Sequence, residues 1–372
     1  MCESGNDLVS LVGDMGQAVR AKSVRLHSVE MSSLGGCIGR KERIVFPLPC
    51  YTLAMACEGT LSGAGVPREP LVALLGPTAS GKSALALTLA ETYAGEIVSA
   101  DSRLLYHGMD IGTAKPTADE RAAVRHHLID VTTPDMPYDL ARWKAEATDT
   151  IADIRGRGRL PLLVGGTAQW TTALLNGWEP PAVAPDVLFR AAMEARAREE
   201  GIAPLLAELA ARDPEAAART GPNLRRIIRA LEVIRATGQP FSVQRGRSEK
   251  PYHDLRIGLS LPRDVLFTRI DARVEAMIAT GLVGEMRALL DAGYDSSLPA
   301  MSGIGYRQVV EYLHGGTTLT TLYEQITQAT HRYARHQMTW LRRDETIIWL
   351  DARDEQRLIA EATEVIRRFL LY

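Results

Sequence analysis

Short apolar runs alternate with helix-like segments from residue 70 onward. Each run has the length typical of a buried strand, whereas the segments between them have the apolar spacing of amphipathic helices. The predicted strands are residues 70–75, 96–100, 160–164, 256–261 and 346–350. The predicted helices are residues 84–93, 264–291, 303–313, 319–340 and 354–370. This alternation predicts an α/β fold in which helices flank a parallel sheet.

Residues 180–249 interrupt this alternation and predict a helical insertion domain. Three prolines stand near the start of the segment, and no strand pattern follows them before residue 256. The helices predicted within it are residues 186–200, 202–212 and 222–236. The chain therefore divides into a first core part, the insertion and a second, mostly helical core part, at residues 69–179, 180–249 and 250–372.

The first 68 residues have no sustained periodicity and are rich in Gly, Ser and Cys. The apolar segment 44–56 follows basic residues, as in a signal peptide, but Pro47, Pro49 and its distance from the N-terminus oppose that interpretation. We expect a poorly ordered extension here. A translation start at Met55 is the alternative.

The overall composition excludes a wholly basic or membrane-spanning protein. The chain has 372 residues, 43 of them basic and 45 acidic, for a net charge of −2. This balance still allows a local basic face for nucleic acid. No apolar run approaches the roughly 18 residues of a membrane span. All four cysteines lie within the first 57 residues, so we expect a cytoplasmic protein whose core carries no disulfides.

A glycine-rich segment between a predicted strand and a predicted helix matches the pattern G-x-x-x-x-G-K-[ST] in full. Its residues are Gly76, Pro77, Thr78, Ala79, Ser80, Gly81, Lys82 and Ser83. Glycines let successive backbone N–H groups turn toward a polyphosphate, lysine adds a positive charge, and the serine hydroxyl binds Mg²⁺. We therefore expect a P-loop parallel-sheet core with Ser83 as the metal ligand. A P-loop fixes the phosphate ligand but not the reaction.

Asp101 stands at the end of the predicted strand 96–100. In an open α/β sheet the carboxyl ends of the strands face the ligand crevice. A carboxylate at this edge binds Mg²⁺ or accepts a proton from a nucleophile. Turn formation is the purely structural alternative, and spacing alone leaves these roles open.

Five segments together resemble the bacterial tRNA isopentenyl transferases, also called tRNA dimethylallyltransferases. They are residues 76–83 (GPTASGKS), 98–116 (VSADSRLLYHGMDIGTAKP), 126–130 (HHLID), 160–167 (LPLLVGGT) and 303–308 (GIGYRQ). The resemblance is collinear over about residues 70 to 350. It implies Mg²⁺-dependent transfer of a dimethylallyl group from dimethylallyl diphosphate to N6 of the adenosine 3′-adjacent to the anticodon. The acceptors would be tRNAs that read U-initial codons.

The resemblance also implies roles for individual residues. The P-loop would hold the diphosphate of the prenyl donor rather than ATP, and Thr78, Lys82 and Arg273 would act on that diphosphate. Asp101 would be the catalytic base. The residues implied in tRNA binding are Asp101, Ser102, Arg103, Leu104, Thr167, Arg225, Arg226, Ile227, Ile228, Arg229, Gly305, Tyr306 and Arg307. The partner would be the anticodon stem-loop, bound by a monomer.

Charge patterning agrees with an RNA footprint in the second half of the chain. Residues 219–273 contain 12 basic and 5 acidic residues, a local charge of +7. Residues 331–343 contain four arginines and no acid. Among the aromatic residues there, Tyr306, Tyr333 and Trp340 either stack on bases or pack in the core. Solvated helix faces are the alternative explanation of the charge runs.

Some positions depart from the family pattern. The stretch Arg335-His336-Gln337 replaces a more usual Lys-Arg-Gln, and Leu188 stands where some members carry an arginine that touches tRNA. Arg190 is the possible substitute for that arginine. Two other classes with a P-loop remain open from the motif alone, a small-molecule kinase and a switch GTPase. The second lacks any Asn-Lys-x-Asp guanine signature.

Overall fold

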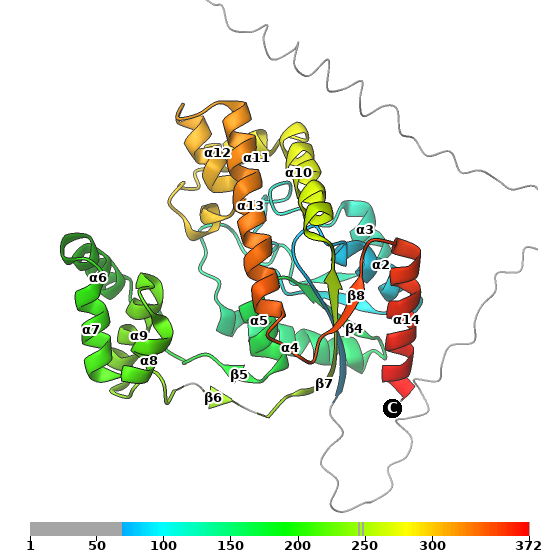
Figure 1. Ribbon diagram of the computed structural model, residues 1–372, viewed down its shortest axis with the longest axis horizontal. Helices are drawn as coiled ribbons and strands as arrows, with labels where there is room; N and C mark the ends of the chain where they lie inside the picture. The colour runs from blue at the N-terminus through cyan, green and yellow to red at the C-terminus, as the bar shows by residue number, and fades with distance from the viewer. Residues whose placement is uncertain (1–68, 245, 248, 372) are drawn as a thin grey trace, which may run out of the picture. The chain divides into compact units, whose positions relative to one another are not determined.

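Six parallel strands form the central sheet of the computed structural model, which describes residues 69–244, 246–247 and 249–371. Their order is β3-β2-β4-β1-β7-β8 (Figure 1). The strands are β1 (Glu69–Leu75), β2 (Glu96–Ser99), β3 (His126–His127), β4 (Pro161–Gly165), β7 (Tyr252–Ser260) and β8 (Ile348–Asp351). The predicted fold class is confirmed, and five of these strands follow the apolar runs. The predictions for residues 1–68 lie outside the described residues.

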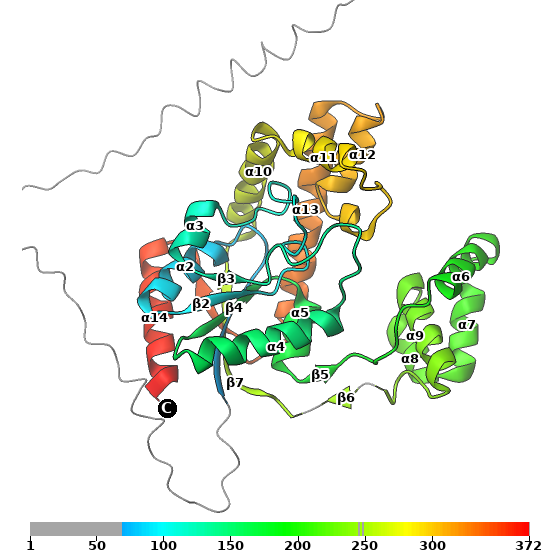
Figure 2. The same ribbon diagram turned by 180° about the vertical axis from the view of Figure 1, so that it is seen from behind.

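Helices cover both faces of the sheet, as Figures 1 and 2 show from opposite sides. One apolar cluster packs α2 (Lys82–Thr92) and α14 (Glu355–Leu371) on one face. A larger cluster joins the other face to six helices. These are α4 (Leu140–Gly156), α5 (Ala168–Leu175), α10 (Arg263–Ala279), α11 (Leu282–Asp291), α12 (Tyr306–Leu313) and α13 (Leu319–Leu341). Two short elements complete this part, α3 (Ala118–Ala123) and the 3₁₀ turn η1 (Pro299–Ser302).

Two predicted helices have different bounds in the structure, and a glycine explains each difference. The segment 264–291 is two helices, because Gly281 takes φ +110° between α10 and α11. The helix predicted from residue 303 begins at Tyr306, after Gly305 takes φ +96°. Such φ values favour glycine and interrupt a right-handed helix.

Residues 187–237 form four helices with an apolar cluster of their own, built around Leu205, Leu209, Ile227 and Leu231. The helices are α6 (Val187–Glu200), α7 (Ala203–Arg212), α8 (Pro214–Thr220) and α9 (Leu224–Thr237). A short antiparallel ladder of β5 (Trp178–Glu179) and β6 (Gly246–Arg247) brackets them. No helix in the described part of the chain is long and apolar enough to cross a membrane.

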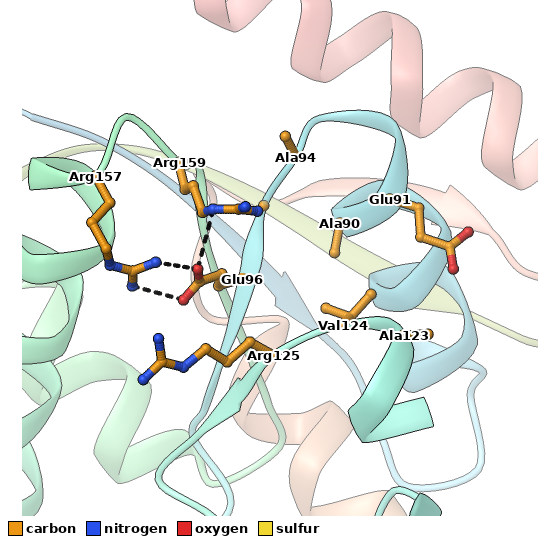
Figure 3. A pocket seen from close by; sticks show the side chains of 10 residues that line it. Ala90, Glu91, Ala94, Glu96, Ala123, Val124, Arg125, Arg157 and Arg159 are labelled. Atoms are coloured by element: carbon orange, nitrogen blue, oxygen red, sulfur yellow. Dashed lines mark hydrogen bonds and ion pairs between the residues drawn. The ribbon is translucent and has the colours of Figure 1, made fainter. Parts of the chain in front are cut away.

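A cluster of arginines closes the amino end of β2 around the buried carboxylate of Glu96. Arg157, at the end of α4, donates two hydrogen bonds to this carboxylate, and they help lower the pKa of Glu96 to about 2. A cavity of about 500 Å³ opens here between Arg125, Arg157 and Arg159 (Figure 3). It lies at the end of the strand opposite to Asp101, so it is separate from the candidate site.

The carboxyl ends of β2 and β4 approach each other too closely for a side chain between them. Ala100 N–H donates to Val164 O at 2.8 Å, just beyond the last residue of β2. A Cβ placed on Gly165 would lie 2.3 Å from the carbonyl oxygen of Ala100. Glycine at this position therefore allows the contact that brings the segment after β2 against the segment after β4.

We predict that Gly165→Ala destabilises the protein by about 1–3 kcal/mol, as overpacking does in a well-packed core. The free energy of unfolding measured in urea tests this. Gly156→Ala is the matched control, because Gly156 is the last residue of α4 and a Cβ there would meet nothing within 4 Å. Equal stability of the two variants would contradict this account of Gly165.

Candidate active site

The glycine-rich loop of residues 76–83 connects β1 to α2 at the carboxyl edge of the sheet. Gly76 takes φ +154°, and a Cβ there would lie 3.0 Å from Ser80 Oγ. Gly81 takes φ +96° and caps the N-terminus of α2. Most of the loop is buried, whereas Ser83 in the first turn of α2 is exposed. The loop thus presents a helix N-terminus, where backbone N–H groups favour an anion.

Two cationic side chains lie beside this loop. Lys82 Nζ donates to Pro77 O within the loop at 2.6 Å. Arg273 of α10 donates from Nη1 to Thr78 Oγ1 at 3.4 Å, and no carboxylate among the described residues pairs with it. Desolvation lowers the pKa of Lys82 to about 7. The negative charge of Asp101 opposes this shift, whereas the positive charge of Arg273 adds to it. Both cations therefore gain from an anion bound at the loop.

Asp101 follows β2 and shares this edge of the sheet. Its Oδ1 accepts the N–H of Arg103 at 2.9 Å, so half of the carboxylate fixes a turn, as the structural alternative required. Oδ2 accepts no hydrogen bond from the described residues. Oδ1 of Asp101 thus holds the turn with Arg103, and Oδ2 remains available to a ligand.

Three segments implied in tRNA binding meet next to Asp101. Ser102 N–H donates to Thr167 Oγ1 at 3.2 Å, which connects the segments after β2 and β4. The Arg103 guanidinium donates to Pro299 O and Ala300 O at 3.2 Å each. It therefore holds the turn η1, which ends at Ser302, three residues before Gly305. The structure makes residues 101–104 and Thr167 neighbours and places the turn that leads to residues 305–307 beside them.

Four residues implied in tRNA binding are buried in the structure. Tyr306 is 1% exposed, and its hydroxyl donates to Glu285 of α11 at 2.6 Å. Gly305 is also buried, and the Ile227 and Ile228 side chains point into apolar cores with 0% and 3% exposure. The side chains of Tyr306, Ile227 and Ile228 fill apolar cores, so their part in tRNA binding stays a prediction.

Arg229 has a structural role in the insertion domain, and its assignment as an RNA contact stays a prediction. It donates to the buried Glu232 at 2.6 Å and to Val183 O at 2.9 Å. Arg190 donates twice to the same carboxylate, at 2.7 Å each. Burial raises the pKa of Glu232, but the bonds from both arginines outweigh it and lower that pKa to about 2. The glutamate three residues after Arg229 on the same helix was the sequence signal that could have predicted this ion pair.

Part of the positive charge of residues 219–273 is therefore already neutralised by ion pairs within the protein. Arg256 is 3% exposed and pairs with Asp254 and Asp344 in the core. By contrast, Arg225, Arg226 and Arg307 are exposed and have no side-chain partner among the described residues. These three retain their positive charge for a ligand.

Sequence reasoning assigned no function to Gln337, yet this side chain joins the two halves of the site. Its Oε1 accepts the N–H of Thr78 at 2.9 Å, and its Nε2 donates to Gly166 O at 3.0 Å. It is 5% exposed, on α13. Tyr333, one turn earlier, keeps 37% of its surface exposed, and its hydroxyl interacts with Thr167 and Gln337.

Comparisons with known proteins agree on one family. The family model described as IPP transferase matches residues 104–344. A tRNA dimethylallyltransferase from Roseiflexus sp. (strain RS-1) is 52% identical over 302 residues, or 81% of this chain and 99% of that protein. One from Thermomicrobium roseum is 50% identical over 285 residues, or 76% of this chain and 87% of that protein.

Solved structures give the same result. The full-length tRNA isopentenylpyrophosphate transferase from Bacillus halodurans superposes with a TM-score of 0.62 at 38% identity, over 82% of this chain and 97% of that one. A eukaryotic dimethylallyltransferase acting on tRNA gives a TM-score of 0.68 at 25% identity, over 81% and 80%. The chain therefore belongs to the IPP transferase family. Within it, the protein is an enzyme of the tRNA dimethylallyltransferase type, a prenyltransferase.

We predict that Arg229→Ala lowers the free energy of unfolding by about 1–3 kcal/mol, since it leaves part of a buried carboxylate unsatisfied. Arg225→Ala is the matched control on the same helix, and we expect no change beyond about 0.5 kcal/mol. Urea unfolding followed by circular dichroism measures both. A stability loss for Arg225→Ala equal to that for Arg229→Ala would refute the division of roles.

Proposed function

We propose that this enzyme transfers the dimethylallyl group of dimethylallyl diphosphate to N6 of the adenosine 3′-adjacent to the anticodon, and releases diphosphate. The acceptors are tRNAs that read U-initial codons, the reaction needs Mg²⁺, and a monomer in the cytoplasm binds the anticodon stem-loop. The observation that supports this most is the meeting of Lys82, Arg273 and the half-free carboxylate of Asp101 at one edge of the sheet, where neither cation forms an ion pair with a carboxylate of the described residues.

The donor side of the reaction needs a site that stabilises negative charge. When the C1–O bond of the donor breaks, the electron pair leaves with the diphosphate, and the allylic cation is delocalised. Lys82, Arg273 and the start of α2 surround the position where that charge develops. Positive groups that are already in place there stabilise the transition state without reorganising.

The residues beside the loop also fit a magnesium ion. The exposed Ser83 hydroxyl, in the first turn of α2, is a hard oxygen donor that would hold the ion. No group of three or more His, Cys, Asp or Glu side chains suited to a metal occurs among the described residues. Such a sparse donor set suits Mg²⁺, which keeps water and substrate phosphates as ligands. When bound, the ion would neutralise charge on the diphosphate.

The acceptor side needs a base, because the adenine amine is a poor nucleophile. As the N6–C1 bond forms, one N6 proton must leave. Asp101 Oδ2, which has no partner among the described residues, would accept that proton, while Oδ1 stays in its turn with Arg103. The carboxylate thus orients the amine before it reacts and neutralises it afterwards.

The RNA must deliver one loop base into this site, because the base edge is inaccessible within a stacked loop. Arg307, in the first turn of α12, and Arg225 and Arg226, at the start of α9, are exposed cations that suit the phosphate backbone. Their lack of carboxylate partners distinguishes them from Arg229 and Arg256. Contacts of this kind position the RNA without reading its sequence.

We predict that Asp101→Asn lowers the turnover number by about 10²–10⁴-fold, the usual contribution of a general base. Affinity for the RNA should change by less than about threefold, because the amide keeps the shape of the carboxylate. The assay follows the mass gain of one C5 unit on an anticodon stem-loop RNA with dimethylallyl diphosphate and Mg²⁺. Asp119→Asn, in the exposed first turn of α3, is the control.

The same assay with ATP in place of the prenyl donor tests the competing kinase function. Phosphate transfer from ATP without any C5 addition would overturn the proposal. Full turnover by Asp101→Asn would leave the reaction in place but remove Asp101 from the role of base.

We predict that inorganic diphosphate takes up a proton when it binds at pH 8. The pKa of Lys82 is about 7 in the free protein, so its amine is largely neutral at pH 8. A bound anion favours the ammonium form and raises this pKa, so affinity falls as the pH rises above 7. Isothermal titration calorimetry in buffers of different ionisation enthalpy measures the uptake. Lys82→Arg stays charged and is the control; equal uptake by both proteins would contradict the assignment to Lys82.

A further inference from the structure

The Gln337 side chain on α13 hydrogen-bonds to the glycine-rich loop and to the segment after β4. Through Oε1 it holds the N–H of Thr78 in the glycine-rich loop, and through Nε2 it holds the carbonyl of Gly166 after β4. A Cβ on Gly166 would lie 2.3 Å from Nε2, so the backbone after β4 leaves room for this amide. The glycine-rich loop and the segment after β4 therefore both bond to the planar amide of Gln337.

An amide satisfies both partners at once and does so at every pH. Thr78 N–H requires an acceptor and Gly166 O requires a donor, and at 5% exposure water does not readily replace either. A carboxylate offers two acceptors and no donor, whereas an apolar side chain of the same length offers neither. This requirement explains why the buried group is Gln rather than a core residue such as Leu or Met.

Tyr333 extends the link from Gln337 to the acceptor side. The two residues are one helical turn apart on α13. Burial raises the pKa of the Tyr333 hydroxyl, and its interactions with the Thr167 and Gln337 side chains oppose this shift. Thr167 Oγ1 in turn accepts the N–H of Ser102, the residue after Asp101. Neighbouring side chains thus connect Thr78 through Gln337, Tyr333 and Thr167 to Ser102, with hydrogen bonds at both ends of the series.

We propose that Gln337, supported by Tyr333, is a positioning element that fixes the separation between the leaving-group loop and Asp101. It rests on the function proposed above. The two reacting groups lie on different segments, so their separation is set by whatever joins those segments. A misplacement of about 1 Å costs up to about 100-fold in rate. Gln337 and Tyr333 act through Thr78 and Thr167.

The first test compares Gln337→Met with the wild-type enzyme in the C5-transfer assay. We expect a turnover number lower by about 10–100-fold, with KM for the RNA and the dissociation constant of inorganic diphosphate within about threefold of wild type. Thr330→Val is the matched control on α13, because the Thr330 hydroxyl bonds only to Ile326 O within the helix. Circular dichroism at the assay temperature verifies that each variant is folded.

The second test uses the pH dependence of Gln337→Glu. When protonated, the introduced carboxyl presents one donor and one acceptor, as the amide does, and when ionised it presents only acceptors. Burial raises the pKa of such a carboxyl. The ratio of variant to wild-type turnover at saturating substrates should therefore rise as the pH falls from about 8 to about 6, while the ratio for Gln337→Met stays flat.

The third test is the double variant Tyr333→Phe with Gln337→Met. Because the two side chains are neighbours one turn apart on α13, the combined loss of turnover should be smaller than the product of the two single losses. Turnover of Gln337→Met within twofold of wild type, a flat ratio for Gln337→Glu, or a loss confined to diphosphate affinity would each overturn the proposal. An absence of C5 transfer by the wild-type enzyme would instead refute the proposed function.

Discussion

The close contact between the segments that follow β2 and β4 is the constraint on which the site depends. Ala100 N–H bonds to Val164 O, and the backbone at Gly165 leaves no room for a side chain beside Ala100 O. Asp101 comes directly after this contact, and the glycine-rich loop follows β1, the strand that pairs with β4 on its other side. Parallel strands all end at the same edge, so two segments distant in sequence become neighbours without any long loop.

Pairing of charges separates the structural arginines from those available to a ligand. Arg229, Arg190 and Arg256 each bond to a buried carboxylate, which needs such partners to remain ionised. Arg273 at the loop and Arg225 on α9 have no carboxylate partner among the described residues. Because a cation without a partner gains most from an added anion, the pattern favours ligand binding at the second group.

The sequence predicts the parts of this structure that depend on neighbouring residues. Five of the six parallel strands, the loop at residues 76–83 and the place of Asp101 at a strand end follow from local apolar runs and local spacing, whereas β3, only two residues long, was missed. The break at Gly281 was missed because the apolar spacing continues across it, and only the backbone conformation shows that the helix ends there.

Roles that depend on tertiary contacts were not predictable in the same way. Arg225 and Arg229 look alike in sequence, yet only Arg229 faces Glu232 and the carbonyl of Val183. Tyr306 was assigned to RNA, but its environment is set by Glu285. Gln337 bonds to Thr78 across 259 positions of sequence, and no local pattern in a single sequence encodes a contact of that range.

The most direct test is a crystal structure of the enzyme with Mg²⁺, an unreactive thio analogue of dimethylallyl diphosphate and an anticodon stem-loop RNA. The account predicts diphosphate oxygens at hydrogen-bonding distance, roughly 2.7–3.2 Å, from Lys82 Nζ and the N–H groups of residues 76–83. It also predicts N6 of the extruded adenine at the same range from Asp101 Oδ2. A donor seated away from the loop, or an adenine that does not reach Asp101, would contradict it.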